Sequence, residues 1–259
     1  MRNIRLIIGY DGTSFHGWQF QPGTRTVEGE LVAGLSRVLR EPVKLLAASR
    51  TDSGVHARGQ AANFMTESSI DLLHLLRGAN STTPYDIAVF NAAEAPLDFH
   101  STRDAIGKHY RYCMRLADMD EPIARRTHWW YRYQLDVDAM RAAAPLLTGT
   151  RDFRGLKVKS GRPNESTVRT VTDVALSQDG ADLMIDIRGK GFMYKQVRSM
   201  VGMLVAAGRG RVRVADIPAL LAGDPAQRRT EVAPPHGLTL MEVFYAPQSS
   251  AMHEETADN

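Results

Sequence analysis

The 259-residue chain contains a single cysteine, Cys113. One cysteine excludes an intramolecular disulfide framework and is typical of proteins from a reducing compartment. No apolar run reaches the length of a transmembrane helix. The amino-terminal residues 1–5 include two arginines and lack the apolar stretch of a signal peptide. We therefore expect a cytoplasmic protein without a membrane segment.

Signals for metal ions and cofactors are also absent from the sequence. The eight histidines show no metal-ligand spacing with Asp, Glu or Cys, and His253-Glu254-Glu255 does not continue into a His-Glu-x-x-His zinc motif. The segment 208–211, Gly-Arg-Gly-Arg, lacks the strand-glycine-helix context of a nucleotide-binding loop. We predict no cofactor and no metal, which disfavours a methyltransferase or a zinc deaminase.

The composition, with 43% hydrophobic and 24% charged residues, is close to that of an average globular protein. The length allows one large domain or two of ordinary size. The net charge of +3 says little, but basic residues without any Asp or Glu fill one stretch: Arg188, Lys190, Lys195, Arg198, Arg209, Arg211 and Arg213. Such a stretch favours binding of phosphates, with a solvated basic face as the alternative.

Hydrophobic periodicity predicts a regular order of elements in the first half. Residues 2–10 alternate between apolar and polar and predict a strand, and residues 27–40 repeat at helical spacing. Strands at 43–48 and 60–65, a helix at 70–76 and a strand at 87–92 follow. The order β-α-β-β-α-β is that of a ferredoxin-like split unit.

The second half repeats this order without repeating the sequence. Strands are predicted at 108–116, 168–177, 182–188 and 238–245, and helices at 137–147, 193–205 and around 220. We predict an α+β fold of two ferredoxin-like halves, with antiparallel sheets side by side forming a basic central cleft. The halves are expected at residues 1–103 and 104–247, followed by a polar, acidic and disordered tail at 248–259.

One loop displays polar side chains between two predicted strands, where a rigid scaffold can position them. Arg50 and Asp52 are two residues apart, so an extended backbone turns both to one side. Gly54 permits a sharp turn after the carboxylate, and His56 and Arg58 continue the polar run. The alternative is a simple turn in which Asp52 hydrogen-bonds to nearby backbone.

The whole string Ser49–Ala57 closely resembles the Arg-Thr-Asp motif of the TruA family of tRNA pseudouridine synthases. Four more segments resemble family motifs in the family's order: 10–19, 108–112, 191–202 and 233–238. The departure is at residues 149–156, where relatives more often have a histidine before the aspartate and an aromatic residue near the end. This departure concerns the conformation of one loop, whereas the other segments carry the chemistry.

The resemblance implies a cofactor-independent isomerisation of uridine, with Asp52 as the catalytic carboxylate acting as nucleophile or base. It implies that Arg198 pairs with this aspartate, although a phosphate contact is the alternative for one arginine of a basic stretch. It implies that Tyr110 contacts the uracil. Tyr112 lies on the same face of the predicted strand, so spacing alone does not separate the two tyrosines.

The resemblance also implies residues that bind the substrate and partners of the enzyme. Arg50 is expected to assist flipping of the target base or to contact a phosphate, and Arg58 is a further candidate for substrate binding. Leu238 ends a stiff turn whose backbone groups are expected to read the uracil edge or to cap the last strand. Expected substrates are uridines at positions 38, 39 and 40 of the tRNA anticodon stem-loop, bound by a homodimer.

A non-catalytic RNA-binding protein made of two ferredoxin-like units is the alternative function. Such modules usually display aromatic side chains on the sheet in a Gly-Phe-Gly-Phe type of string. That string is absent from the sequence, which favours the enzyme.

Overall fold

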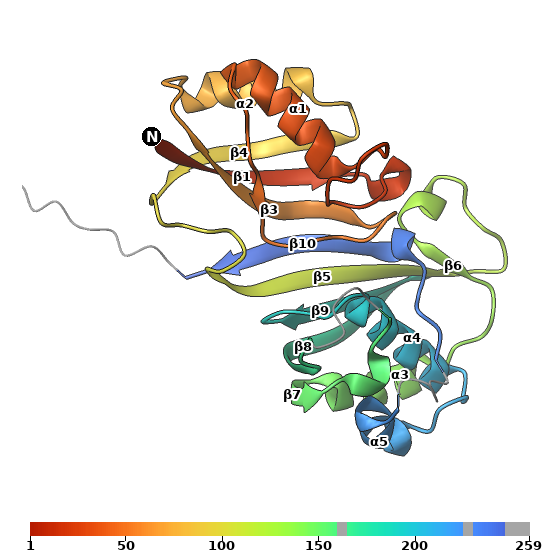
Figure 1. The fold of residues 1–259 in the computed structure, drawn as a ribbon. Coiled ribbons are helices and arrows are strands. Elements are labelled where there is room, and N and C mark those ends of the chain that lie inside the picture. The colour runs from red at the N-terminus through yellow and green to blue at the C-terminus, as the bar shows by residue number, and fades with distance from the viewer. Residues whose placement is uncertain (160–164, 225–229, 247–259) are drawn as a thin grey trace, which may run out of the picture.

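The computed structural model describes residues 1–159, 165–224 and 230–246. The predicted tail at 248–259 lies outside these residues. The fold is mixed α+β, with one large sheet and helices gathered near its two ends (Figure 1). No helix among the described residues is long and apolar enough to cross a membrane.

The first half contains β1 (Arg2–Tyr10), α1 (Val27–Leu39), β2 (Leu46–Ala47), β3 (His56–Thr66), α2 (Leu72–Thr82) and β4 (Ile87–Ala95). Strand β1 lies between β3 and β4 and is antiparallel to both, and β2 pairs with β3. The alternating residues Ile4, Leu6 and Ile8 are fully buried, which confirms the predicted amino-terminal strand. The strand predicted at 43–48 is shorter, because only two of its residues pair with β3.

The second half begins with β5 (Ala105–Leu116), β6 (Trp129–Tyr131), α3 (Val137–Ala143) and β7 (Gly149–Asp152). It continues with β8 (Val168–Asp179), β9 (Asp182–Gly189), α4 (Gln196–Gly208), α5 (Ile217–Ala222) and β10 (Leu238–Tyr245). Short 3₁₀ helices cover Gly12–Ser14, Ala124–Arg126, Ala144–Leu147, Arg154–Leu156, Val214–Asp216 and Pro235–Gly237. Helix α4 begins later than the predicted 193, because Lys195 adopts a left-handed conformation with φ of 58°.

The strands form one continuous sheet in the order β4-β1-β3-β10-β5-β9-β8-β7. Strand β10 joins the halves, because it pairs with β5 in antiparallel and with β3 in parallel orientation. The structure therefore has a single sheet where the sequence predicted two sheets side by side. Periodicity predicts which residues form strands, but it does not reveal that the last strand is inserted next to β3.

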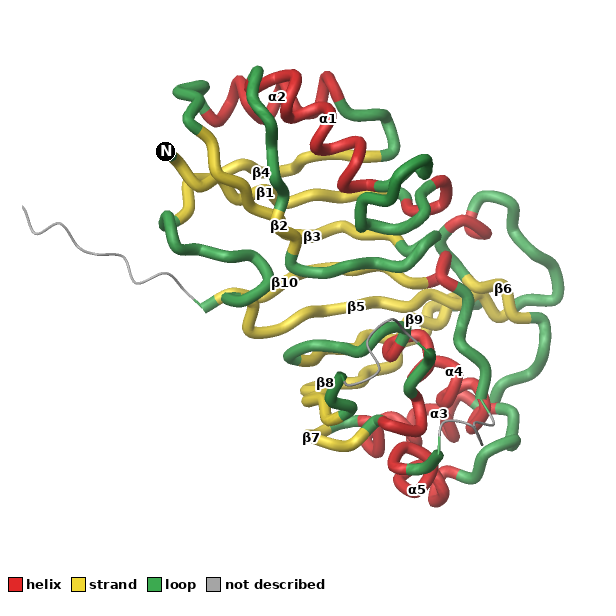
Figure 2. The backbone as a smooth tube through the Cα atoms, in the orientation of Figure 1, coloured by secondary structure: helices red, strands yellow, loops and turns green. Residues whose placement is uncertain are grey.

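The helices leave the middle of the sheet between them. Figures 1 and 2 show α1 and α2 near β4 and β1, and α3, α4 and α5 near the β7–β9 end. Helix α4 is buried along its whole length, which explains its run of apolar and small residues. The loop that follows β2 and the amino end of α4 approach each other across β10 and β5. The polar side chains of the Asp52 loop meet those of α4 at this place.

Candidate active site between the β2–β3 loop and helix α4

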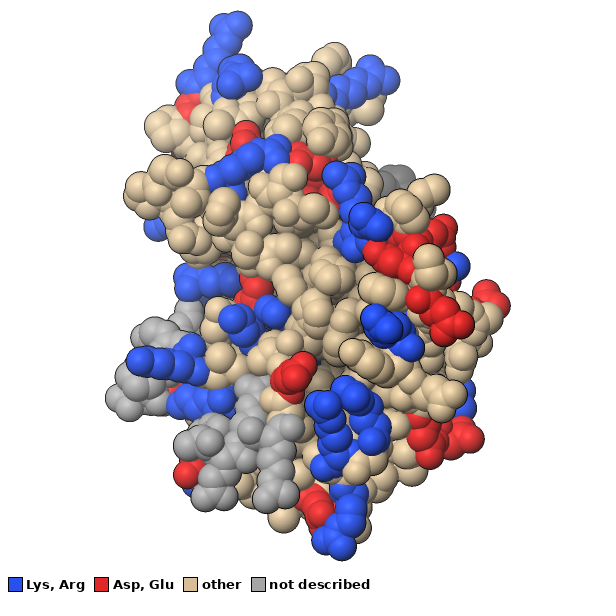
Figure 3. Space-filling model, turned by 90° about the vertical axis from the view of Figure 1, so that its right-hand side faces the viewer, with Lys and Arg blue, Asp and Glu red and all other residues tan. Residues whose placement is uncertain are grey.

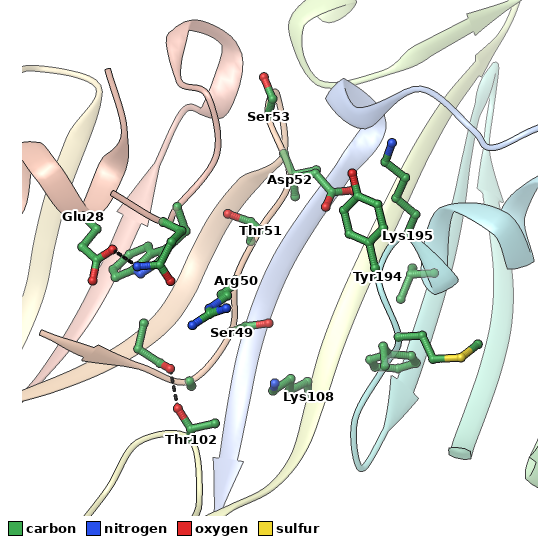
Figure 4. Close-up of a pocket in the computed structure, with 18 of the residues that line it drawn as sticks. Glu28, Ser49, Arg50, Thr51, Asp52, Ser53, Thr102, Lys108, Tyr194 and Lys195 are labelled. Atoms are coloured by element: carbon green, nitrogen blue, oxygen red, sulfur yellow. Dashed lines mark hydrogen bonds between the residues drawn. The ribbon is translucent and has the colours of Figure 1, made fainter. Parts of the chain in front are cut away.

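A cavity of about 1410 Å³ lies between the β2–β3 loop, the start of β5 and the amino end of α4 (Figure 4). Five of the six site residues expected from the sequence line it: Arg50, Asp52, Tyr110, Arg198 and Leu238. These residues come from four elements or loops that are far apart in the sequence. The sixth, Arg58, is placed elsewhere and is described below.

The Asp52 loop is held in place by the segment that follows β1. The backbone N–H of Trp18 donates to the carbonyl of Thr51 at 3.1 Å, and the N–H of Gly54 donates to the carbonyl of Phe15 at 3.3 Å. Gly54 has φ of +78°, a conformation that favours glycine, so the chain can turn directly after Asp52. Residues 10–19, which resemble a family motif, therefore have a structural role in supporting the loop. This role does not require contact with a substrate.

The base of the loop is fixed by buried hydrogen bonds. The side-chain amide of Gln60 accepts from the N–H of Ser49 at 3.2 Å and donates to the Ser49 carbonyl at 2.6 Å. The hydroxyls of Tyr10 and Thr51 lie 2.7 Å apart. Because buried polar groups are costly to leave unpaired, these contacts favour one conformation of the loop.

Asp52 forms an ion pair with Arg198, as the sequence predicted. Nη1 of Arg198 donates to Oδ2 of Asp52 at 2.9 Å, and Nε of the same guanidinium donates to the carbonyl of Ala233 at 2.7 Å. The two side chains are 11% and 18% exposed, so water screens the pair only partly. Two acceptors fix the plane of the guanidinium, and the guanidinium in turn fixes the carboxylate.

Tyr110 brings a neutral hydroxyl to the same cavity. Its oxygen lies 2.8 Å from Oγ of Ser49, and its ring meets the Phe192 ring edge-on at 5.6 Å between centroids. Burial, and to a smaller extent the negative charge of Asp52, raise the pKa of Tyr110 to about 12. The phenol therefore stays protonated at neutral pH and can donate or accept a hydrogen bond.

The structure separates the two tyrosines that spacing could not. Tyr112 is fully buried, and its hydroxyl donates to the carbonyl of Pro234 at 2.9 Å. Its ring also lies so close to Gly237 that a side chain at that position would overlap it. Tyr112 therefore supports the turn at 233–238, while Tyr110 lines the cavity.

The remaining predicted residues differ in their placement. Arg50 is exposed at the cavity and makes no hydrogen bond or ion pair with another described residue, whereas Leu238 is 5% exposed and lines the wall. Arg58 is exposed but lies outside the lining. Ala57 pairs with Leu240, which pairs with Tyr110, so these three residues share one face of the sheet. Side chains alternate along β3, so Arg58 points to the opposite face. Its assignment to substrate binding stays a prediction.

Three further residues at the cavity were missed by sequence reasoning: Lys108, Tyr194 and Lys195 (Figure 4). Lys108 precedes Tyr110 by two residues on β5, and burial lowers the pKa of its amine. Lys195 belongs to the basic stretch, so its charge was noticed but not its position at the start of α4. Tyr194 is 43% exposed and had no signal in the sequence.

The arrangement combines one oriented carboxylate, one neutral phenol and several cations at the edge of an open cavity. A carboxylate held by a guanidinium can attack a carbon or remove a proton, and the cations can bind a polyanion. Among the described residues, no group of three or more His, Cys, Asp or Glu side chains could hold a metal ion.

Comparisons with known proteins identify the family of the chain. A family model described as tRNA pseudouridine synthase matches residues 6–102 and 143–246. A protein named tRNA pseudouridine synthase A from Geobacter sp. (strain M21) is 43% identical over 246 residues, covering 95% of this chain and 99% of the relative. The protein of the same name from Citrifermentans bemidjiense is 43% identical over 95% of this chain and 98% of the relative.

Among solved structures, the archaeal box H/ACA sRNP Nop10-Cbf5 complex matches with a TM-score of 0.36 and 14% identity, over 78% of this chain and 42% of that chain. This last similarity is too weak to support any conclusion. The family model and the full-length relatives suffice, and the chain belongs to the tRNA pseudouridine synthase family.

Proposed function

We propose that this tRNA pseudouridine synthase uses Asp52 as its catalytic carboxylate on uridines of the anticodon stem-loop. One observation carries the proposal: within the described part of the chain, the hydrogen bonds of the Arg198 guanidinium go to the Asp52 carboxylate and the Ala233 carbonyl at the wall of the cavity. An arginine buried to this degree would otherwise add a desolvation cost without a benefit to the fold.

The reaction is an isomerisation in which every atom is accounted for. The bond between ribose C1′ and uracil N1 breaks, the uracil turns within the cavity, and C1′ bonds to C5. The proton on C5 leaves and N1 gains a proton, so no oxidant, reductant or energy source is consumed. Asp52 acts on the sugar, either by attack on C1′ or by removal of a proton, and both roles require its ionised form.

The other cavity residues divide the remaining tasks. Tyr110 contacts the uracil ring, and its protonated hydroxyl, together with Ser49, lies where the C5 proton is exchanged. Arg50 is exposed and unpaired within the described part of the chain. Its side chain can therefore fill the space that the flipped base leaves in the stack, or bind the displaced phosphate. Leu238 forms the apolar wall against which the base rests.

The proposed substrate is tRNA, with uridines at positions 38, 39 and 40 as targets and a symmetric homodimer as the active assembly. The basic residues from 188 to 213 support binding of the phosphate backbone. The lone Cys113 fits an enzyme of the reducing cytoplasm.

We also infer that residues 1–103 and 104–247 are two ferredoxin-like units. The support is the repeated strand order. The path β4-β1-β3, extended by β2 on β3, corresponds to the path β10-β5-β9-β8 in the second half. Each path is the spatial order of a β-α-β-β-α-β unit.

Mapping of the product tests the proposed substrate directly. Unmodified transcripts of one tRNA are prepared with uridine at position 38, 39 or 40, and a control transcript carries cytidine at all three. After incubation, pseudouridine is located by chemical derivatisation and primer extension. Product at these positions, and none in the control, supports the proposal; product elsewhere in the tRNA refutes the assignment to the anticodon stem-loop.

A further inference from the structure

A second cavity, of about 370 Å³, lies between β6 and the carboxyl-terminal half of α4. It shares no described lining residue with the cavity at Asp52. Aromatic and basic side chains dominate its wall, among them Trp129, Tyr131, Tyr133, Arg209 and Arg211. The catalytic steps proposed above use none of these residues, and Arg209 and Arg211 entered only as members of the basic stretch.

The aromatic rings of this cavity form a continuous series. The rings of Trp129 and Tyr131 meet edge-on at 5.0 Å between centroids, and those of Tyr131 and Tyr133 meet at 5.7 Å. Tyr131 is 6% exposed, whereas Tyr133 is 55% exposed. The series therefore begins in the core and ends with a ring that is more than half exposed.

A buried hydroxyl lies at this wall. The Tyr131 hydroxyl oxygen has no hydrogen bond of ordinary geometry among the described residues, although the Arg209 guanidinium acts on it as a nearby donor. Burial raises the pKa of Tyr131, so the group stays a protonated donor at neutral pH. A ligand that supplies an acceptor would give the hydrogen of this hydroxyl a partner.

The rim of the cavity carries positive charge. The Arg209 guanidinium lies 4.9 Å from the Tyr133 ring centroid and that of Arg132 lies 5.7 Å from it, while Arg211 is exposed at the wall. Glu231 is the acidic residue of the described lining. Figure 3 faces the β6 end of the molecule and shows basic side chains grouped in its lower half. Stacked aromatic and guanidinium groups with free cations are the elements that bind unstacked nucleotides.

Helix α4 contributes residues to both cavities. It carries Arg198 in its first turn, and Arg209 directly follows its last residue, so the two arginines are about 16 Å apart along the helix axis. Gly202, at the middle of the helix, packs against the carbonyl of Glu231, and two residues later the carbonyl of Ala233 accepts from Arg198. One RNA molecule of stem-loop size can therefore reach both cavities.

We propose that the cavity between β6 and α4 binds a second, unstacked nucleotide of the RNA substrate, with its base on Tyr133 and its phosphate at Arg209 and Arg211. Tyr131 donates the hydrogen of its hydroxyl to an acceptor on this nucleotide. The contact anchors the RNA while the target uridine occupies the cavity at Asp52. The inference rests on the proposed function for the identity of the RNA, and on the cavity alone for the nucleotide.

Exposed positions provide variants that leave the fold unchanged. We expect Tyr133→Leu to raise the dissociation constant of tRNA about fivefold to a hundredfold, the range for loss of one stacked base. Tyr133→Phe keeps the ring and should bind like the unmodified chain. Arg211→Gln should weaken binding and lower the slope of log K against log salt by about one. Arg141→Gln is the matched control, because Arg141 is exposed, pairs with Asp138 and lies outside both cavities and outside the basic stretch.

The outcomes are measured by fluorescence anisotropy with labelled tRNA and by kinetics of pseudouridine formation. The proposal predicts a higher KM and an unchanged kcat for Tyr133→Leu. Equal binding by Tyr133→Leu and the unmodified chain overturns it, and so does an equal loss of binding in Arg141→Gln, which would indicate binding to positive charge anywhere on the surface. If the unmodified chain binds tRNA in a Tyr133-dependent manner but forms no pseudouridine, the proposed function fails and the second site stands.

Photochemical crosslinking locates the nucleotide independently of affinity. A tRNA transcript containing 4-thiouridine is irradiated with the protein, and the crosslinked peptides are identified by mass spectrometry. We expect crosslinks within residues 129–133 that disappear in Tyr133→Leu, in addition to crosslinks near Asp52. Crosslinks confined to the peptides around Asp52 contradict a second nucleotide site.

Discussion

Nη1 of Arg198 donates to Oδ2 of Asp52 across 146 residues of sequence, at 2.9 Å. The carboxylate belongs to a loop of the first half, and the guanidinium belongs to α4 of the second. The carbonyl of Ala233, in the segment leading to β10, completes the contact. Because β10 also joins the two parts of the sheet, the geometry of Asp52 depends on the assembly of the whole chain and not on its own loop alone.

The role of Arg198 as a positioning residue predicts a graded effect. Arg198→Lys keeps the charge but offers one point donor in place of a fork, and Arg198→Met removes both contacts. We expect kcat for pseudouridine formation to fall by about a hundredfold or more in Arg198→Met and less in Arg198→Lys, with smaller changes in KM for tRNA. If both variants lose activity only through a raised KM, Arg198 contacts the RNA and does not orient Asp52.

The close approach of α4 to the segment after residue 230 predicts sensitivity to one methyl group. A Cβ on Gly202 would lie 1.8 Å from the carbonyl oxygen of Glu231, so Gly202→Ala must displace that backbone. We expect a loss of about 1–3 kcal/mol in the free energy of unfolding, with reduced kcat because Ala233 moves as well. Gly191→Ala is the control, since a Cβ there meets no atom within 4 Å. Equal stability of the two variants in urea unfolding would contradict the contact.

The buried phenol of Tyr110 predicts how stability depends on alkaline pH. Its pKa is raised to about 12 in the folded chain, against about 10 in the unfolded chain. Folding therefore favours the protonated form, and this contribution is complete below pH 10 and is lost as the pH rises towards 12. Urea unfolding between pH 9 and 12 should show a smaller loss of stability in Tyr110→Phe than in the unmodified chain. Parallel curves would show that Tyr110 is not protected from solvent.

Arg50 and Arg58 are both exposed arginines, and one lies in the loop before β3 and the other on β3 itself. Only Arg50 lines the cavity, and it has no partner among the described residues. We expect Arg50→Ala to reduce kcat by about tenfold or more without lowering the melting temperature, because it removes a group that acts on the displaced base or phosphate. Arg58→Ala should retain kcat. An equal loss in Arg58→Ala would show that the RNA also contacts the opposite face of β3.

Local pattern predicted most elements of the fold, since alternation in β1 and helical spacing in α1 are read from neighbouring residues. It did not predict that β10 pairs with both β3 and β5, because such pairing depends on contacts between distant segments. The late start of α4 was missed as well. Lys195 carries an unusual left-handed backbone that no residue type announces.

The site shows the same division. Asp52, Arg198 and Tyr110 were named through the resemblance, and the structure brings them to one cavity. Gln60, which supports the Asp52 loop, had no sequence signal, because a hydrogen bond to a loop backbone requires no fixed spacing. Tyr10 belonged to a segment that resembles a family motif, but its contact with Thr51 was not predicted. Arg58 was included because it continues the polar string, and strand alternation turns it away from the cavity.

Release of tritium from tRNA labelled at C5 of uridine measures the central claim most directly, since C5 loses its hydrogen only when C1′ is joined to it. The unmodified chain is compared with Asp52→Asn, which keeps the size of the side chain and removes its charge. We predict release by the unmodified chain and none above background by Asp52→Asn, with equal binding of tRNA and an unchanged circular dichroism spectrum. Sustained release by a folded Asp52→Asn variant would contradict the assignment of Asp52 as the catalytic carboxylate.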